Sequence, residues 1–110
     1  MDLARPESEN DAMPYFIEVR DRPGCEQIRI DFQEQHLAYL DSNISRLLAA
    51  GGLLDDEGAV AQGGLFILDV DNRADAQRFI AEDPFSKAGL FEIVQIRRWR
   101  KGYLANQRLI

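Results

Sequence analysis

Gly64-Leu65-Phe66-Ile67-Leu68-Asp69-Val70 is an almost uninterrupted apolar run, and it decides the fold. A run of this composition predicts a buried strand. Because neighbouring side chains of a strand point to opposite faces, Phe66 and Ile67 each require cover on their own side. The run therefore predicts a strand whose sheet is covered on both faces.

The segments before this strand predict a strand, a helix and a hairpin. Tyr15–Arg20 is rich in strand formers and leads into turn residues. From about Glu26 to Ala50 apolar residues recur at steps of three and four, which predicts a long helix stopped by Gly51-Gly52. Its expected apolar stripe consists of Leu37, Leu40, Ile44, Leu47 and Leu48. A short strand at Leu53–Asp55 is then expected to form a hairpin with the 64–70 strand through a turn at 56–58.

The segments after this strand predict one more helix and one more strand. Asp71 and Asn72 are good N-caps for a second helix, which the Asp83-Pro84 pair ends. The last predicted strand is Phe91–Trp99. The order strand, helix, strand, strand, helix, strand predicts an α+β, ferredoxin-like fold, with a four-stranded antiparallel sheet and two helices on one face.

The predicted helices leave the second face of the sheet without cover. Three of the strands nevertheless carry apolar residues at both odd and even positions, which point to opposite faces of the sheet. These neighbours are Phe16 and Ile17, Phe66 and Ile67, and Ile93 and Val94. A second copy of the same sheet would cover this face, so the pattern predicts a homodimer through the sheet face. The alternative cover is the C-terminal tail, 101–110, which is too short for a whole sheet.

Length and charge define the class of protein. The chain has 110 residues and predicts one domain at 13–100, after a floppy acidic leader at 1–12 and before a tail at 101–110. The net charge, 13 − 19 = −6, argues against a nucleic-acid partner. We find no targeting segment, and the longest uncharged run, 58–68, is far shorter than the roughly 20 residues of a membrane helix. These features predict a cytoplasmic protein without a membrane partner.

His36 and Asp83 are the candidate catalytic residues. His36 is the single histidine, and helical spacing places its ring at the border of the buried face, where it could exchange protons with a ligand. Pro84 forces Asp83 off the helix end, so that its carboxylate could orient the imidazole. Both residues also have simpler interpretations, His36 as a packing histidine and Asp83 as part of a turn.

Other kinds of site have weaker support in the sequence. One histidine and one cysteine predict no metal site, and the absence of a glycine-rich phosphate loop predicts no nucleotide cofactor. Cys25 is interpreted as a bystander thiol. The basic cluster at 97–101 could bind an anion, but pairing with the acidic surface or with a partner subunit is the preferred interpretation.

From about Tyr15 to Trp99 the chain resembles the YciI-like family, also called YCII-related domain proteins, of the dimeric α+β barrel superfamily. The resemblance rests on His36-Leu37-Ala38-Tyr39-Leu40, on segments 50–58 and 63–68, and on Asp83-Pro84-Phe85-Ser86-Lys87-Ala88-Gly89-Leu90-Phe91-Glu92 with the closing Arg98-Trp99. It implies an active-site pair of histidine and aspartate, matching His36 and Asp83. At least one family member eliminates chloride from a chlorinated aromatic ring.

The chain departs from the family pattern at two places. Gln33 occupies the position where many members have an arginine, and Gly51-Gly52 stands where they have Gly-Pro. Arg29, two helical turns before His36, could replace the missing arginine, although a solvated arginine is the simpler interpretation.

Two main hypotheses for the function follow. The first is a small cofactor-independent enzyme in which His36 performs acid/base chemistry on a small organic substrate and Asp83 orients it, in an elimination, isomerisation or hydrolysis. Gly51, Gly52 and Phe85 are the expected substrate-binding walls of a pocket between the sheet and the first helix. The second is a non-catalytic ligand-binding or assembly module. A degenerate family member without activity is a third possibility, which Gln33 favours.

Overall fold

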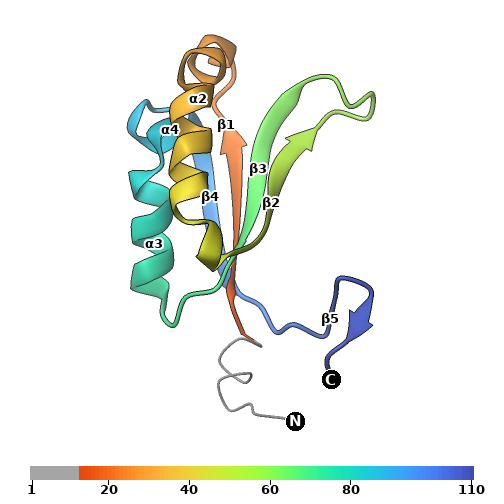
Figure 1. Cartoon of the computed structure of the whole chain (residues 1–110). Coiled ribbons are helices and arrows are strands. Elements are labelled where there is room, and N and C mark those ends of the chain that lie inside the picture. Colours follow the sequence, from red (N-terminus) through yellow and green to blue (C-terminus); the bar gives the residue numbers. More distant parts are fainter. Residues whose placement is uncertain (1–12) are drawn as a thin grey trace.

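The computed structural model describes residues 13–110, which form a sheet covered on one face by helices (Figure 1). The predicted leader, 1–12, lies outside the described residues. The elements are β1 (Tyr15–Asp21), α2 (Glu26–Ser42), a 3-10 turn (Ile44–Arg46), β2 (Leu47–Leu54), β3 (Ala61–Leu68), α3 (Arg73–Glu82), α4 (Pro84–Lys87), β4 (Phe91–Arg98), β5 (Tyr103–Leu104) and β6 (Gln107–Arg108). The four long strands pair antiparallel in the order β2-β3-β1-β4. The predicted ferredoxin-like α+β fold is confirmed.

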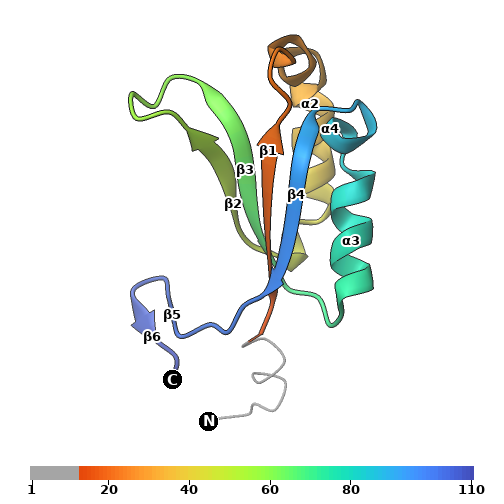
Figure 2. The ribbon, with the colours of Figure 1, turned by 180° about the vertical axis from the view of Figure 1, so that it is seen from behind.

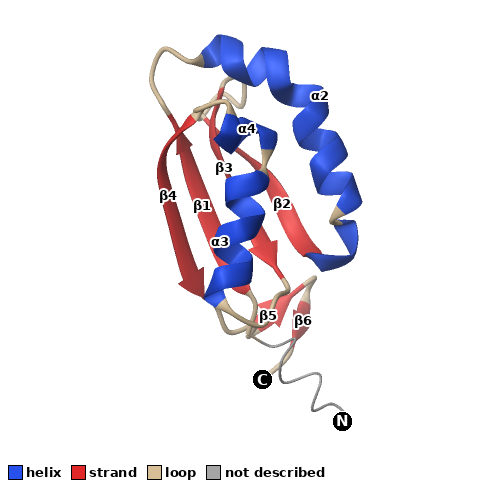
Figure 3. Ribbon diagram, turned by 90° about the vertical axis from the view of Figure 1, so that its left-hand side faces the viewer, coloured by secondary structure: helices blue, strands red, loops and turns tan. Residues whose placement is uncertain are grey.

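The hydrophobic core lies between the sheet and the helices (Figure 3). Alternate residues of β1, namely Tyr15, Ile17 and Val19, are buried on this side, as the period of two requires. Phe66 and Leu68 of β3 join them, and α3 contributes Ala76, Phe79 and Ile80. The side chain of Asn72 caps α3 by accepting a hydrogen bond from the backbone N–H of Asp75, as predicted.

The long helix is shorter than the apolar spacing predicts, and that prediction was wrong. α2 ends at Ser42, and 47–50 belong to β2 instead of the helix. Asn43 closes the helix end, where its side chain donates to the backbone oxygen of Tyr39. The backbone of β2 then pairs with β3 along its length, and this long-range pairing outweighs the local helical period.

The correction changes the roles of two predicted features. Gly51-Gly52 is not a helix stop but lies inside β2, opposite Leu65 and Gly64. Of the expected apolar stripe, Leu40 and Leu47 pack against the core. Leu37 and Ile44 are 47% and 68% exposed. The face of α2 towards the sheet is partly polar and borders a cavity that is described below.

The opposite face of the sheet has no helix over it (Figure 2). It carries the half-buried side chains of Phe16, Leu65 and Ile67, the exposed Ile93, and the polar residues Glu18 and Arg20. Apolar residues therefore occur on both faces of β1 and β3, in agreement with their parity in the sequence. We call this surface the open sheet face.

The tail forms a small hairpin that the sequence pattern did not predict. β5 and β6 pair through a turn in which Ala105 and Asn106 both have positive φ, 53° and 65°. Two consecutive positive φ angles characterise the tight turns that match the twist of a hairpin. Figures 1 and 2 show this hairpin projecting from the lower end of the sheet, on the side away from the helices.

None of the helices in the described range is long and apolar enough to cross a membrane.

Candidate active site

The structure brings together His36 from the middle of α2 and Asp83 from the residue after α3. The Nδ1 atom of His36 lies 2.9 Å from Oδ2 and 3.0 Å from Oδ1 of Asp83. The Asp83 side chain has no exposed surface, whereas that of His36 is 12% exposed. Because an ionised carboxylate can only accept, Nδ1 is the donor in this contact, and a neutral ring held in this way has its lone pair on Nε2.

The local sequence explains why Asp83 can make this contact. With Pro84 next in the chain, Asp83 leaves the helical region and has φ −61° and ψ 132°. Its carboxylate Oδ1 also accepts a hydrogen bond of 2.8 Å from the backbone N–H of Phe85. Asp83 therefore caps α4 and holds His36 with the same carboxylate, and the expected departure from the helix end is confirmed.

Phe85 packs against the imidazole of His36. The two rings are stacked, with centroids 4.2 Å apart and an interplanar angle of 20°. The guanidinium carbon of Arg29 lies 4.9 Å from the centroid of the same phenyl ring. Arg29 and His36 are two turns apart on α2, about 10 Å along the axis, which leaves room for the buried phenyl ring between them.

Arg29 is itself held by Asp21 at the end of β1. Its Nε and one terminal nitrogen donate to the two carboxylate oxygens of Asp21, both at 2.8 Å. Arg29 is thus neither a solvated helix arginine nor a free cation. The sequence analysis did not predict this ion pair, because the residues around Asp21 indicate only a turn.

A cavity of about 330 Å³ lies between α2 and the sheet and includes His36. The structure places all three expected wall residues, Gly51, Gly52 and Phe85, in its lining. Gly52 lies opposite Gly64, on the parity that faces the helices, whereas Gly51 has the opposite parity. Arg29, Gln33, His36, Leu37 and Leu40 form the helical side of this inner cavity, at spacings that place them on one face of α2.

Glycine is required at Gly63 for a steric reason. A Cβ atom there would lie 2.2 Å from the backbone oxygen of Val19, which is too close for any side chain. Gly63 of β3 and Val19 of β1 both line the inner cavity.

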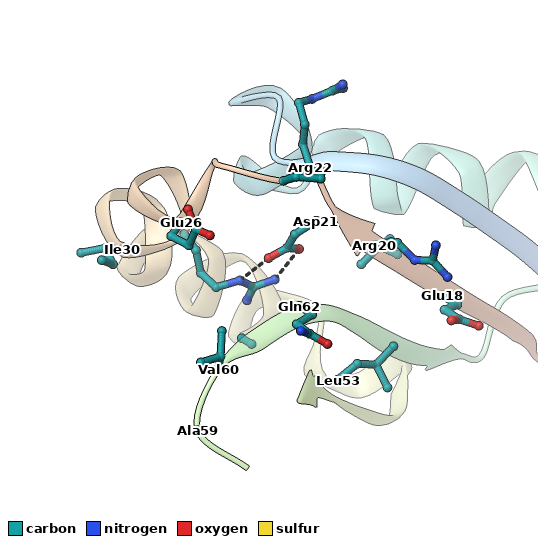
Figure 4. Close-up of a pocket in the computed structure, with 14 residues that line it drawn as sticks. Glu18, Arg20, Asp21, Arg22, Glu26, Ile30, Leu53, Ala59, Val60 and Gln62 are labelled. Carbon is teal, nitrogen blue, oxygen red and sulfur yellow. Dashed lines mark hydrogen bonds and ion pairs between the residues drawn. The ribbon is translucent and has the colours of Figure 1, made fainter. Parts of the chain in front are cut away.

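A larger cavity of about 750 Å³ adjoins the inner one and shares Val19, Arg29 and Ala61 with it. Figure 4 shows it between the end of β1, the start of α2 and the splayed β2–β3 hairpin, with the ion pair of Asp21 drawn as dashed lines. We call it the outer cavity. Its charged lining residues include Glu18, Arg20 and Glu26, but no histidine or cysteine.

Tyr39 is a structural residue beside the pair that the sequence did not single out. Its hydroxyl donates a hydrogen bond of 2.7 Å to the backbone oxygen of Phe79, which ties α2 to α3. Burial, followed by the negative charges of Glu82 and Asp83, raises the pKa of Tyr39 to about 12. The phenol therefore stays protonated at neutral pH and keeps its role as a donor.

The described part of the chain offers little support for a metal site or a reactive cysteine. Within 13–110 no group of three or more His, Cys, Asp and Glu residues is arranged to hold a metal ion. Cys25 is a free, partly exposed thiol in the N-cap position of α2 and makes no capping hydrogen bond through its side chain.

Fold and site together define an α+β ferredoxin-like domain with a carboxylate–imidazole pair beside an internal cavity. The chain belongs to the YCII-related domain family, whose model matches residues 13–100. It is 33% identical over 96 residues to an uncharacterised protein of Haemophilus influenzae, a match that covers 81% of this chain and 98% of the relative. The family is the YciI-like family of dimeric α+β barrels.

One solved structure is similar in both sequence and fold. It is the 5-chloro-2-hydroxyhydroquinone dehydrochlorinase TftG of Burkholderia phenoliruptrix AC1100, in complex with 2,5-dihydroxybenzoquinone. It is 33% identical to this chain, with a TM-score of 0.73, over 82% of this chain and 95% of the other.

Proposed function

We propose that this protein is a small cofactor-independent enzyme in which His36 is the general acid/base and Asp83 orients it. The observation that carries the proposal is the contact of His36 Nδ1 with both oxygens of the buried Asp83 carboxylate. This contact leaves Nε2 as the proton-accepting nitrogen of a ring that lines the inner cavity.

The inner cavity limits the size of the substrate. A volume of about 330 Å³ lies at the small end of ligand sites and suits a single ring. Phe66, Phe85 and Phe91 supply aromatic lining, while Gln33 supplies a neutral amide without a partner among the described residues. We infer that the substrate is a small hydroxylated ring compound, as the name of the similar dehydrochlorinase also suggests.

The reaction that fits these groups best is an elimination driven by proton removal. The proton of one substrate hydroxyl first moves to the chlorine-bearing ring carbon, which gives a keto tautomer with a tetrahedral carbon. His36 Nε2 then takes the proton of a second hydroxyl, the electron pair of that O–H bond forms a C=O bond, a ring double bond shifts, and the C–Cl bond breaks with loss of chloride. The imidazolium then returns the proton to water. Proton transfer by a positioned side chain contributes about 10²- to 10⁴-fold to the rate.

The test is chloride release from 5-chloro-2-hydroxyhydroquinone by the wild type and by the His36→Gln variant. We expect turnover in the wild type and a loss of about 10²- to 10⁴-fold in kcat in the variant. Equal rates in both proteins would contradict the role of His36. Binding of 2,5-dihydroxybenzoquinone by both proteins, without turnover of chlorinated hydroxyquinols by the wild type, would favour the second candidate.

The second candidate is a non-catalytic ligand-binding module. It is favoured by the absence of a free cation in the lining of the inner cavity: Arg29 is engaged by Asp21, and Gln33 is neutral. In that case His36 would only hydrogen-bond the ligand.

The proposal includes a homodimer through the open sheet face. Phe16, Leu65 and Ile67 are half-buried in the single chain and would gain cover from a second sheet. Membership of a family of dimeric α+β barrels supports this arrangement.

A further inference from the structure

The C-terminal segment, 97–110, is strongly basic. It holds five of the 13 Lys and Arg residues and none of the 19 Asp and Glu residues. Arg98 donates to the Tyr15 hydroxyl and to the Met13 backbone oxygen, which fixes the end of β4. Arg100 and Lys101 have no hydrogen bond or ion pair among the described residues. We call 100–110, which contains the β5–β6 hairpin, the C-terminal arm.

The arm contains apolar side chains that its own chain leaves exposed. Tyr103, Leu109 and Ile110 are all exposed, the first of them by 67%. An isolated two-stranded hairpin is at best marginally stable in water. The arm therefore has both the charge and the apolar surface of a segment that is completed by a partner.

The tip of the β2–β3 hairpin has the opposite charge. From 47 to 72 the chain has five acidic residues and no basic one, and three of the acids, Asp55, Asp56 and Glu57, lie at this tip. Asp55 accepts hydrogen bonds from the backbone N–H groups of Ala59 and Val60, which lower its pKa and keep it charged. Asp56 and Glu57 are exposed and have no partner among the described residues.

The acidic tip and the basic arm lie at opposite ends of the sheet and on the same side of it. Figures 1 and 2 show both projecting away from the helices, the tip at the upper end and the arm at the lower end. A two-fold axis across the strands would place the tip of each copy beside the arm of the other. An axis along the strands would instead place tip against tip and arm against arm, which like charges disfavour.

We propose that two copies stack with their strands in opposite directions, so that the arm of each copy binds the acidic tip of the other. The contact rests on the sheet-face dimer of the proposed function and specifies its orientation. Arg100 and Lys101 face Asp56 and Glu57 of the second copy, and this contact occurs twice in the symmetric dimer.

The contact also bears on the candidate site. The outer cavity is bounded on one side by the hairpin segment 59–62, next to the acidic tip. An arm from the second copy at this tip lies beside this wall of the outer cavity, which shares Val19, Arg29 and Ala61 with the inner cavity.

A charge exchange tests the contact in the 110-residue chain by analytical ultracentrifugation. The tip variant carries Asp56→Lys and Glu57→Lys, and the arm variant carries Arg100→Glu and Lys101→Glu. We expect each variant to raise the dimer dissociation constant about tenfold or more at low salt. The protein with all four changes should regain most of the lost dimer affinity, because the opposite charges are restored. The matched control is Asp31→Lys with Glu34→Lys on α2, which we expect to leave the dissociation constant unchanged.

Two results would overturn the contact. In the first, neither the tip variant nor the arm variant changes the dimer dissociation constant. In the second, the protein with all four substitutions has a dimer dissociation constant no lower than that of either double variant. A monomer at all concentrations would overturn both the contact and the sheet-face dimer. None of these results bears on His36 and Asp83, whose test is turnover.

Cysteine cross-linking provides a second readout that is independent of affinity. In a Cys25→Ser background, Glu57→Cys and Tyr103→Cys are made in separate chains, which are mixed and treated with a short bis-maleimide. We expect cross-links between the two kinds of chain and few within either kind. Preferential cross-linking of Glu57→Cys chains with one another would show the parallel arrangement and contradict the proposal.

Discussion

His36 and Asp83 are separated by 47 positions in the chain, yet the imidazole Nδ1 lies 2.9 Å from the carboxylate of Asp83. The carboxylate is fully buried and also caps α4, so it holds the ring from a fixed position. The lone pair of the neutral ring is consequently on Nε2. In the proposed function, this arrangement makes His36 an oriented base.

Replacing the carboxylate should remove this orientation. In Asp83→Asn the amide nitrogen can donate to Nδ1, which favours the tautomer with the proton on Nε2 and removes the base from the cavity. We expect kcat to fall by about 10²-fold or more while the cavity keeps its ligand affinity. Chloride release and equilibrium binding measure the two effects separately, and Asp75→Asn on the exposed side of α3 is the control. A variant with wild-type kcat would mean that Asp83 serves only as a helix cap.

The two glycines of β2 offer a matched test of the inner cavity. A Cβ on Gly52 would make ordinary contacts of 3.8 Å with the Gly63 backbone oxygen and the Leu54 side chain, whereas one on Gly51 would meet nothing within 4 Å. Only Gly52 has the parity that faces the helices. We expect Gly52→Ala to weaken binding of 2,5-dihydroxybenzoquinone about tenfold, and Gly51→Ala to leave it unchanged. Equal effects would place the ligand elsewhere.

Arg29 is expected to act on His36 through Phe85. Arg29→Met removes the guanidinium from the phenyl face and leaves Asp21 without its partner. We expect a looser Phe85 ring, a smaller ring-current shift of the His36 protons and a fall in kcat with little change in KM. Asp21→Asn keeps Arg29 but weakens the contact that holds its guanidinium in place. This variant should therefore change the His36 shifts and kcat in the same direction as Arg29→Met, but by less. Unchanged His36 proton shifts in Arg29→Met would contradict this positioning role.

Tyr39 makes stability sensitive to high pH. The folded state raises the pKa of its phenol from 10.0 to about 12, so between these values the unfolded chain loses this proton while the folded chain keeps it. Its contribution is complete below the ordinary pKa of 10.0 and declines as the pH rises towards 12. Denaturant unfolding at about pH 8 and about pH 11 measures this loss, which Tyr39→Phe should reduce.

The same variant tests the hydrogen bond at neutral pH. Tyr39→Phe leaves the backbone oxygen of Phe79 without its donor, which we expect to cost about 1–2 kcal/mol of unfolding free energy. A change within experimental error would show that water replaces the phenol at this site.

The strands and the second helix could be predicted because local signals agree with the tertiary structure. The strand run around Phe66, the Asn72 cap and the Asp83-Pro84 stop each lie where the local pattern indicates. Residues 47–50 continue the helical spacing but pair with β3 in the structure, since long-range strand pairing outweighs an ambiguous local pattern. The β5–β6 hairpin was missed because its turn uses Ala105 and Asn106 instead of glycine.

The candidate site shows the same division. The pairing of His36 with Asp83 was suggested by the proline after Asp83 and by the family resemblance. The contact of Arg29 with Asp21 and the stacking of Phe85 on His36 depend on how α2 crosses the end of β1 and α4, and no spacing in the sequence reports that crossing. The lining of the inner cavity contains no free cation, because Gln33 is neutral and Arg29 is paired with Asp21.

The tautomer of His36 tests the central claim most directly, because the chain has a single histidine and no substrate is needed. Nitrogen-15 NMR of the neutral imidazole distinguishes a protonated ring nitrogen from one with a free lone pair. We expect the proton on Nδ1 and the lone pair on Nε2 in the wild type, and a loss of this preference in Asp83→Asn. A wild-type ring with its proton on Nε2, or one that ignores the change at Asp83, would contradict the proposed pair.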